Sequence, residues 1–345
     1  MNRLNLREIV SNGALVVCSL LLTFALVEIV YSSIGLSIYR KGKVTGPRWQ
    51  WQWLVFDPIE GWVNRPKYKH DENFEIDVNG FRIVSGMANS AVRTVVCMGD
   101  SGTFGIWNDG EWIRFPSYPP KLQELLGIDW RVLNAGVVGY TSSHLLRQYM
   151  TRIRKLKNKP TYILIRTGFN DHKLEWDSRR AVREPVSPLK RTLLYNFGST
   201  FTIQTAIALN NRNPVAGTPG RRWHSLEEFK TNLEKLITYA RADGVTPVLV
   251  DYPIRPASFP GLIPAGELPP DLGVADYADL IRLHAEYNGA IVAVGRDTGT
   301  PVIETTHLLT DIRSQGFSST DVAHPNARGM AIVAQQIASF LRSTP

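Results

Sequence analysis

The sequence predicts an α/β fold, a three-layer α/β/α domain with a parallel sheet, preceded by one transmembrane helix. Three observations predict it. Short apolar runs alternate with amphipathic helical patterns, polar residues directly follow several of these runs, and one long apolar segment lies near the start of the chain. With 345 residues, of which 43% are hydrophobic and 20% charged, the chain can build a sizeable core and does not belong to the disordered class.

The first element is an apolar run over residues 9–31, IVSNGALVVCSLLLTFALVEIVY, whose single charge is Glu28. A helix of this length spans roughly 30 Å, the thickness of the hydrocarbon core of a bilayer. A cleaved signal peptide is the alternative, but the run is long for one and no clean cleavage site follows it. A lipoprotein anchor at Cys18 is disfavoured because the run continues well past that cysteine. We therefore predict an uncleaved transmembrane anchor within residues 1–35, with Glu28 near enough to its end to reach the interface.

The charges that flank this run do not fix its orientation. Basic residues are more numerous after the run than before it, so the positive-inside rule places the rest of the chain in the cytoplasm. The rule is weak where a large domain follows a single span, and the orientation stays open on charge alone. The flanking basic residues are Arg3 and Arg7 before the run, and Arg40, Lys41, Lys43 and Arg48 after it.

A linker and N-terminal extension is predicted over residues 36–90. Trp49, Trp51 and Trp53 alternate within it, so an extended backbone would place all three rings on one face. We expect these rings to pack on the main domain or to lie at the membrane interface, rather than to bind a sugar.

The main domain, predicted over residues 91–345, alternates strands and helices. Its short apolar runs are typical of buried strands and cover residues 95–98, 131–134, 162–165, 247–250 and 301–303. Amphipathic helical patterns cover residues 121–126, 143–156, 225–240 and 325–341. The third helical pattern begins with a capping box, Ser225 to Glu228. Apolar strands separated by amphipathic helices indicate a parallel sheet covered on both faces.

One segment breaks this rhythm. Residues 172–224 are long, basic and rich in Arg and Pro, and we interpret them as an inserted excursion beside the functional site. Ligands of such sheets bind beyond the carboxyl ends of the strands, where this excursion would lie.

Polar clusters stand at the ends of the predicted elements. Each has an ordinary explanation when taken alone, such as a helix cap, a turn or an Asx-turn. A parallel sheet, however, brings the carboxyl ends of its strands to one rim, so we expect the clusters to converge. They are Gly99-Asp100-Ser101, Asn134-Ala135-Gly136, Gly168-Phe169-Asn170-Asp171 and Asp321-Val322-Ala323-His324.

Together these clusters supply the groups that acyl transfer needs. Ser101 is a candidate nucleophile, which becomes reactive only when a base removes its proton. His324 can be that base, and Asp321, three residues earlier, can orient its ring and stabilise the imidazolium. The backbone N–H groups of Ser101 and Gly136 and the side-chain amide of Asn170 can stabilise the oxyanion of the tetrahedral intermediate. We expect the small Gly136 to let the backbone approach the substrate closely.

These four blocks resemble those of the SGNH, or GDSL-type, serine hydrolases. The resemblance implies a flavodoxin-like hydrolase fold over the domain, a nucleophile at Ser101, oxyanion donors at Gly136 and Asn170, and an acid and base at Asp321 and His324. The matching blocks are GDSGTFG at 99–105, NAGVVGYTS at 134–142, GFND at 168–171 and DVAHPN at 321–326.

The upstream segment resembles the membrane-anchored bacterial members of the same family. Gly61-Trp62, Pro66 and Asn79-Gly80-Phe81-Arg82 match stretches that those members carry. The resemblance implies a domain that faces the periplasm or the cell exterior, against the count of flanking charges. One departure is Gly102, where relatives often carry a larger residue, and we expect it to widen the pocket.

Other functional classes find less support. Two cysteines, Cys18 and Cys97, cannot build a disulfide framework or a four-ligand zinc site. The turn at 99–105 is neither a P-loop nor a dinucleotide fingerprint. We predict no metal and no cofactor. The histidines that fall in no recognised ligand spacing are His70, His144, His172, His224, His284 and His307.

The net charge of +8 invites an anionic partner without requiring one. We expect the clustered basic residues to form solvated helix faces, with anionic lipid or an acidic polysaccharide as the alternative partner. Nucleic acid fits poorly, because no recognition motif is present. The clusters are Arg147, Arg152, Arg154, Lys155, Lys157 and Lys159, then Arg179, Arg180, Arg183, Lys190 and Arg191.

The sequence therefore predicts a single-pass, membrane-anchored serine esterase that cleaves a carboxylic ester through an acyl-Ser101 intermediate. Its expected substrate is an acylated carbohydrate or lipid of the cell envelope, reached from the periplasmic side. Two alternatives remain open: an O-acyltransferase that uses the same triad, and a non-catalytic envelope carbohydrate-binding module on a hydrolase scaffold.

Overall fold

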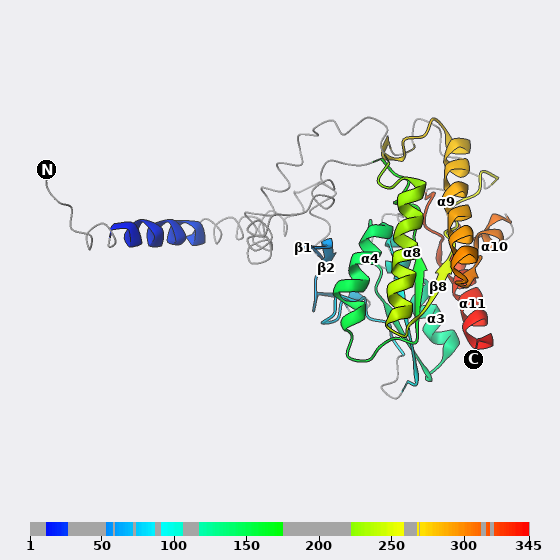
Figure 1. Ribbon diagram of the computed structural model, residues 1–345, viewed down its shortest axis with the longest axis horizontal. Helices are drawn as coiled ribbons and strands as arrows, with labels where there is room; N and C mark the ends of the chain where they lie inside the picture. Colours follow the sequence, from blue (N-terminus) through cyan, green and yellow to red (C-terminus); the bar gives the residue numbers. More distant parts are fainter. Residues whose placement is uncertain are drawn as a thin grey trace.

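In the computed structural model, helices pack on a central sheet to form an α/β domain, and a short helix precedes it near the N-terminus (Figure 1). The predicted excursion lies outside the described residues except for its two ends, and so do Trp49 and Trp51. The residues that the structure describes are 12–26, 53–57, 59–71, 74–86, 91–105, 117–174, 222–258, 268, 270–311, 315–317 and 321–344.

The centre of the domain is a five-stranded parallel sheet with the strand order β6-β5-β7-β8-β9. Of the strands in this sheet, the one that comes first in the chain, β5, therefore lies between the second, β6, and the third, β7. Flavodoxin-like sheets have the same order, and their ligands bind where the strand order reverses. Here that point lies between β5 and β7. The strands are β5 (Arg93–Gly99), β6 (Trp130–Asn134), β7 (Tyr162–Arg166), β8 (Thr246–Val250) and β9 (Val302–Ile303).

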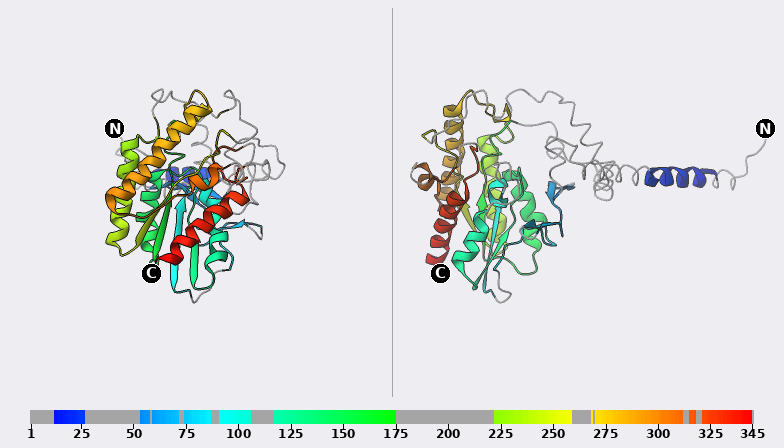
Figure 2. Two further views of the ribbon diagram at one scale, coloured as in Figure 1. Left: turned by 90° about the vertical axis from the view of Figure 1, so that its right-hand side faces the viewer. Right: turned by 180° about the vertical axis from the view of Figure 1, so that it is seen from behind.

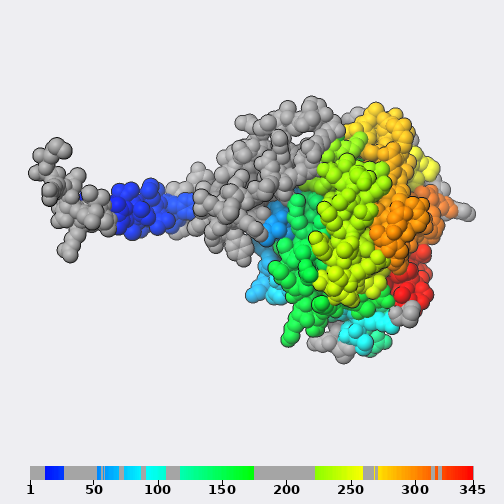
Figure 3. Space-filling view, in the orientation of Figure 1, coloured from blue at the N-terminus to red at the C-terminus, as the bar shows by residue number. Residues whose placement is uncertain are grey.

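Two helical layers cover the sheet, which confirms the predicted α/β architecture. Helices α4, α8 and α9 lie on one face, with α8 running between the other two (Figures 1 and 3), and α3 and α11 lie on the opposite face (Figure 2). The helices are α2 (Ser101–Phe104), α3 (Tyr118–Leu126), α4 (Ser142–Thr151), α8 (Leu226–Ala242), α9 (Tyr277–Thr298), α10 (Thr306–Thr310) and α11 (Ala327–Ser343), with 3-10 turns at Ile153–Lys155 and Pro270–Leu272.

The alternation of side chains along β5 divides the hydrophobic core in two. Val96 and Met98 point to the layer of α4, α8 and α9, whereas Val95 and Cys97 point to the layer of α3 and α11. All four side chains are fully buried. Both faces of the strand are thus apolar, as the continuous apolar run predicted.

The helix boundaries follow local capping chemistry. At the start of α8 the hydroxyl of Ser225 accepts from the N–H of Glu228 at 3.2 Å, while the Glu228 carboxylate accepts from the N–H of Ser225 at 2.9 Å. This confirms the predicted capping box. The pattern over 143–156 is not one helix, because α4 ends at Thr151 and a 3-10 turn follows.

The sequence analysis predicted no helix where the structure has α9, the longest helix of the described residues. Its buried face contains His284 and two tyrosines among the aliphatic side chains, so the apolar periodicity that identifies a helix is weakened. The buried positions are Tyr277, Leu280, His284, Tyr287, Ala290, Ile291, Val294 and Gly295.

Part of the predicted linker is folded onto the domain. Two antiparallel hairpins form, one from β1 (Leu54–Asp57) and β2 (Gly61–Asn64), the other from β3 (Lys69–Asp71) and β4 (Phe74–Glu75). Trp53 is 2% exposed and packs with Phe74 and Phe104, in agreement with the expectation that the ring packs on the domain. We call residues 53–57, 59–71 and 74–86 the N-terminal extension.

Residues 12–26 form a helix whose side chains are all exposed. Within the described residues, no helix combines the length and the apolar character that crossing a bilayer requires. The predicted span over 9–31 reaches beyond residues 12–26 on both sides, and the anchor stays a prediction.

Candidate active site

The turn after β5 places Ser101 at the rim of the sheet. Asp100 caps α2, since its Oδ1 accepts from the N–H of Gly102 at 2.9 Å, and Ser101 is the first helical residue. Gly105 ends the helix with a φ of 95°, a left-handed conformation that favours glycine. Ser101 is therefore held by a strand on one side and a capped helical turn on the other.

The loop before α11 brings His324 to this serine. The Nε2 atom of His324 lies 2.7 Å from Ser101 Oγ, although 223 positions separate the two residues. On the other side of the ring, Nδ1 lies 2.8 Å from Asp321 Oδ2. Since the carboxylate only accepts, Nδ1 carries the hydrogen, and Nε2 is left to accept from the serine hydroxyl.

The loop is rigid because Asp321 also binds its backbone. Asp321 Oδ1 accepts from the N–H of Ala323 at 2.8 Å and from the N–H of His324 at 3.0 Å. The side chain of Asn326 then caps α11 by accepting from the N–H of Gly329 at 3.0 Å. The predicted convergence of Ser101, Asp321 and His324 is thus present in the structure.

The charges of the pair shift both pKa values. Burial lowers the pKa of His324, but the charge and hydrogen bond of Asp321 outweigh it, so the net shift is upward. Burial raises the pKa of Asp321, but the charge of His324 and three hydrogen bonds outweigh that effect, and the net shift is downward. The pair favours a charged imidazolium beside a carboxylate, the state that a general base reaches after it takes a proton.

Two of the predicted oxyanion donors are engaged inside the protein. The N–H of Gly136 donates to Asn134 Oδ1 at 3.0 Å. The side-chain nitrogen of Asn170 donates to Asp100 Oδ2 and to the carbonyl of Tyr140, both at 3.1 Å. Both hydrogens of the Asn170 amide are thus used, one of them in a bond to Asp100, the residue that directly precedes Ser101.

Close packing against α2 requires the small size of Gly136. A Cβ at this position would clash with the backbone of α2 at Thr103 and Phe104. The glycine therefore lets its loop approach the nucleophile helix. The expectation that it also lets the backbone approach the substrate stays a prediction.

A buried arginine occupies the space beside Gly102. A Cβ on Gly102 would lie 2.5 Å from Arg166 Nη1 and 2.7 Å from the hydroxyl of Tyr252. The guanidinium stacks on the Tyr252 ring, 4.0 Å from its centroid. Gly102 does not widen the pocket, because Arg166 fills the volume that a larger residue after the serine would take.

Asp100 connects this arginine to the rest of the site. Its carboxylate accepts from Gly102, Asn170 and the hydroxyl of Tyr252, the last at 3.1 Å. Burial raises the pKa of Asp100, although the positive charges of Arg166 and His324 act in the opposite direction. Among the described residues the side-chain nitrogens of Arg166 have no hydrogen-bond partner, so the contribution that the structure shows is its charge and its ring contact. No sequence signal marked Arg166, which directly follows the apolar run of β7.

The residues after Asn170 hold its loop in place. Asp171 accepts from the N–H and hydroxyl of Ser142 at 2.9 and 2.6 Å and from the hydroxyl of Thr167 at 2.9 Å. This agrees with the interpretation of Asp171 as an anchor of the turn. His172 Nε2 lies 3.0 Å from His284 Nδ1, and His284 Nε2 lies 2.6 Å from the carbonyl of Tyr252.

Residues of the first basic cluster have structural partners. Arg152 pairs with Glu60 at 2.7 Å, Arg154 pairs with Asp243 at 3.0 Å, and Lys159 donates to the carbonyl of Asp243 at 3.0 Å. The expectation of a solvated face is wrong for Arg152, which is part-buried against a buried carboxylate, whereas Arg154 and Lys159 are exposed as expected. The second cluster lies outside the described residues.

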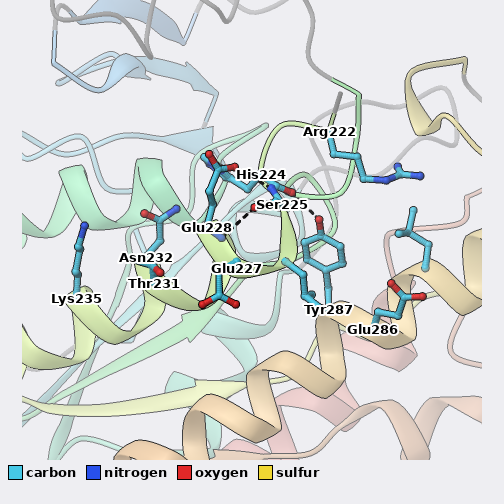
Figure 4. Close-up of a pocket in the computed structure, with 12 residues that line it drawn as sticks. Arg222, His224, Ser225, Glu227, Glu228, Thr231, Asn232, Lys235, Glu286 and Tyr287 are labelled. Atoms are coloured by element: carbon cyan, nitrogen blue, oxygen red, sulfur yellow. Dashed lines mark hydrogen bonds and ion pairs between the residues drawn. The ribbon is translucent and has the colours of Figure 1, made fainter. Parts of the chain in front are cut away.

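A large hollow lies away from the serine. It occupies about 1050 Å³ between the N-terminal half of α8 and α9, and its lining includes neither Ser101 nor His324 (Figure 4). Several polar side chains in it already serve the fold. Glu228 completes the capping box, and the hydroxyl of Tyr287 donates to the carbonyl of His224 at 2.6 Å. The chemistry of the serine and histidine therefore does not take place in this hollow.

Comparison with known proteins points to one group. The model of the GDSL-like lipase/acylhydrolase family matches residues 97–332. A search of curated proteins returned no match.

Similar solved structures include three bacterial enzymes, all with low sequence identity. A GDSL-like lipase from Bacteroides thetaiotaomicron is 16% identical, with 73% of this chain and 89% of that chain covered and a TM-score of 0.42. A lipase/acylhydrolase from Enterococcus faecalis is 16% identical, with 73% and 96% covered and a TM-score of 0.46. A catalytic mutant of an acetylxylan esterase from Geobacillus stearothermophilus is 17% identical, with 73% and 94% covered and a TM-score of 0.42.

Proposed function

Because the chain belongs to the GDSL-like lipase/acylhydrolase family and is a hydrolase of ester bonds, we propose that it cleaves a carboxylic ester through an acyl intermediate on Ser101. The observation that carries this proposal is the hydrogen-bonded series Ser101–His324–Asp321, with distances of 2.7 and 2.8 Å. A hydroxyl, an imidazole and a carboxylate in this order are the parts of a general-base-activated nucleophile.

In the first half of the reaction Ser101 Oγ attacks the ester carbonyl while His324 Nε2 takes the hydroxyl proton. The tetrahedral intermediate collapses when its C–O bond to the alcohol breaks, and His324 returns the proton to the departing alcohol. In the second half, His324 removes a proton from water, the resulting hydroxide attacks the acyl-serine, and the proton returns to Ser101 Oγ as the carboxylic acid leaves. Asp321 stays ionised throughout and stabilises the imidazolium.

The oxyanion needs donors that are otherwise engaged in the free protein. Its negative charge competes with the neutral Asn134 Oδ1 for the N–H of Gly136, and charge-assisted hydrogen bonds are about twice as strong as neutral ones. The amide of Asn170 has to turn one hydrogen away from Tyr140 or Asp100 to reach the same oxygen. We propose that Gly136, Asn170 and the N–H of Ser101 form the oxyanion hole only when the intermediate develops.

This proposal is tested with a fluorophosphonate probe and a short-chain aryl ester. The wild-type chain should be labelled at Ser101 and should release the alcohol, Ser101→Ala should do neither, and His324→Ala should nearly abolish both. Ser339→Ala is the matched control, because Ser339 is an exposed serine on α11 that bonds only to its own helix. Unchanged turnover in Ser101→Ala would overturn the mechanism.

We further propose that the chain is anchored in a membrane by residues 9–31 and acts on an acylated carbohydrate or lipid of the cell envelope from the periplasmic side. The supporting observations are the apolar run itself, the helix at its centre and the upstream residues that resemble anchored family members. A reporter fused to the C-terminus measures the side. A reporter active only in the cytoplasm would refute the periplasmic placement.

A further inference from the structure

The N-terminal extension contacts the two segments that carry the reaction, although it precedes the family match at 97–332. The ring of Trp53 stacks on Phe104 of α2, with centroids 6.1 Å apart, and Phe74 meets the same ring edge-on at 5.7 Å. Val138, from the loop that carries Gly136, completes this cluster. The extension therefore covers the nucleophile helix and the Gly136 loop together.

Strand β2 binds the Gly136 loop through two side-chain donors. The amide nitrogen of Asn64 donates to the carbonyl of Gly136 at 2.9 Å and to the carbonyl of Gly80 at 3.0 Å. Two residues earlier, the indole N–H of Trp62 donates to the carbonyl of Val138 at 2.8 Å. Asn64 is fully buried, so water does not replace these bonds when they are lost.

Arg82 holds the end of the nucleophile helix. Its Nη1 donates to the carbonyls of Phe104 and Gly105 at 2.8 and 2.9 Å, which are carbonyls that a helix end leaves without partners. Its backbone N–H donates to the carbonyl of Asn134 at 3.0 Å, the residue whose side chain holds the N–H of Gly136. The guanidinium thus links α2 to the start of the Gly136 loop.

A buried carboxylate fastens the extension to α4, beside which β1 and β2 lie in Figure 1. Glu60, 1% exposed, accepts from Arg152 at 2.7 Å, from the hydroxyl of Thr151 at 2.5 Å and from the hydroxyl of Tyr140 at 2.9 Å. The carbonyl of Tyr140 is one of the two acceptors for the amide of Asn170. The extension consequently contacts Gly136 directly, reaches Asn170 through Tyr140, and holds the helix of Ser101 through Phe104 and Gly105.

We propose that Asn64 and Arg82 are positioning residues of the esterase, which fix the Gly136 loop and the helix of Ser101 relative to each other. The inference rests on the proposed function of Ser101 and Gly136. Both side chains bind backbone carbonyls and act through them. Their effect is on the placement of the oxyanion donors, where a displacement of about 1 Å can lower the rate about 10²-fold.

The test separates placement from stability. Asn64→Leu keeps the volume and removes both donors, and Arg82→Met keeps the length and removes the guanidinium. Each should lower kcat for an aryl ester by about 10²-fold, the effect of losing one oxyanion donor, with KM changed less than about twofold. Binding of an alkyl boronic acid, which forms a tetrahedral adduct with a serine, should weaken in parallel.

The control is Leu236→Ala, a buried position on α8, a helix that carries none of the triad residues or oxyanion donors. It should reduce the melting temperature at least as much as the two test variants while the kcat of the folded protein stays near wild type. If Asn64→Leu is too unstable to purify, Trp62→Phe removes one N–H to the same loop and keeps a ring, and its kcat should fall about tenfold.

Two different failures can be told apart with the same measurements. If Ser101→Ala is inactive while folded Asn64→Leu, Arg82→Met and Trp62→Phe keep the wild-type kcat and boronic acid affinity, the positioning role is wrong and the esterase proposal stands. If Ser101→Ala keeps full turnover, the proposed function itself fails.

Discussion

His324 and His284 lie near the same rim of the sheet, His324 part-buried and His284 buried, and the group that faces each imidazole is different. His324 lies against the carboxylate of Asp321, whereas His284 lies against a second imidazole, His172, and a backbone carbonyl. The pKa of His324 is raised. Burial lowers the pKa of His284 to about 4, and burial, then the charges of His284 and Arg222, lower that of His172. Burial alone therefore does not decide the protonation of a histidine, because the neighbouring group decides it.

The two pairs should respond very differently to removal of the imidazole. His324→Gln should lower kcat/KM by about 10⁴-fold or more, because it removes the base that is hydrogen-bonded to Ser101 Oγ. His284→Gln should keep kcat/KM within about threefold, since a glutamine amide can donate to Tyr252 and accept from His172 as the imidazole does. Steady-state kinetics on an aryl ester measures both.

His307→Gln, at an exposed position, controls for the substitution itself. Comparable losses in His324→Gln and His284→Gln would remove the distinction between the two pairs.

The orienting carboxylate comes next in expected effect. Asp321→Asn should lower kcat about 10²- to 10⁴-fold, because an asparagine amide can donate to Nδ1 and leave the hydrogen on Nε2, where it blocks acceptance from Ser101. Asp297→Asn, which removes an exposed ion pair on α9, should have no effect on kcat. An Asp321→Asn variant with wild-type kcat would show that the ring needs no orienting partner.

The pH dependence of the unfolding free energy should reveal the protonation state of His284, which pairs with His172. A histidine whose pKa falls from 6.5 to about 4 on folding stays neutral in the native state, while the unfolded chain takes up a proton as the pH drops below 6.5. The protein should therefore lose about 2 kcal/mol of unfolding free energy through His284 between pH 7.5 and pH 5.

Urea denaturation at the two pH values measures this loss of unfolding free energy. In His284→Gln the loss should be smaller by about 2 kcal/mol. The sign is opposite for His324. Its raised pKa contributes stability that is present below pH 6.5 and disappears as the pH rises through the native pKa. An equal pH response in wild type and His284→Gln would contradict the neutral assignment.

The smallest expected effect is a displacement of the pH–rate profile. Protonated His324 cannot act as a base, so kcat/KM should fall below a midpoint that lies above 6.5, by about tenfold per pH unit. Asp321 and Asp100 raise this midpoint, and Lys173 lowers it. In Asp321→Asn the residual activity should persist to lower pH. A wild-type midpoint below 6.5 would speak against the raised pKa.

The sequence was most informative about the strands and about the polar residues that follow them. The strands of the sheet came from uninterrupted apolar runs, and the convergence of Ser101 and Asn170 followed from their places after the parallel strands β5 and β7. His324 joins them from the loop before α11. These features are local, or follow from a topology with few alternatives.

The rest depends on contacts that leave no local trace. Arg166 reads as the polar residue that ends a strand, yet its side chain is fully buried beside Gly102. Asn64 and Gly136 are 72 positions apart, and nothing near either residue indicates that they bond. The His172–His284 pair involves a helix that the pattern did not indicate. A buried polar contact is recognised only when both partners are placed in space.

The order of the groups along the chain has a consequence for biosynthesis. A nascent polypeptide that has emerged as far as α9 already contains the hydroxyl of Ser101, the Gly136 loop and Asn170, but its base and acid follow only at residues 321–324. Every product that terminates before residue 321 therefore has an unactivated alcohol in place of a nucleophile. Esterase activity begins only after the last loop has been made and has docked beside the first strand of the sheet.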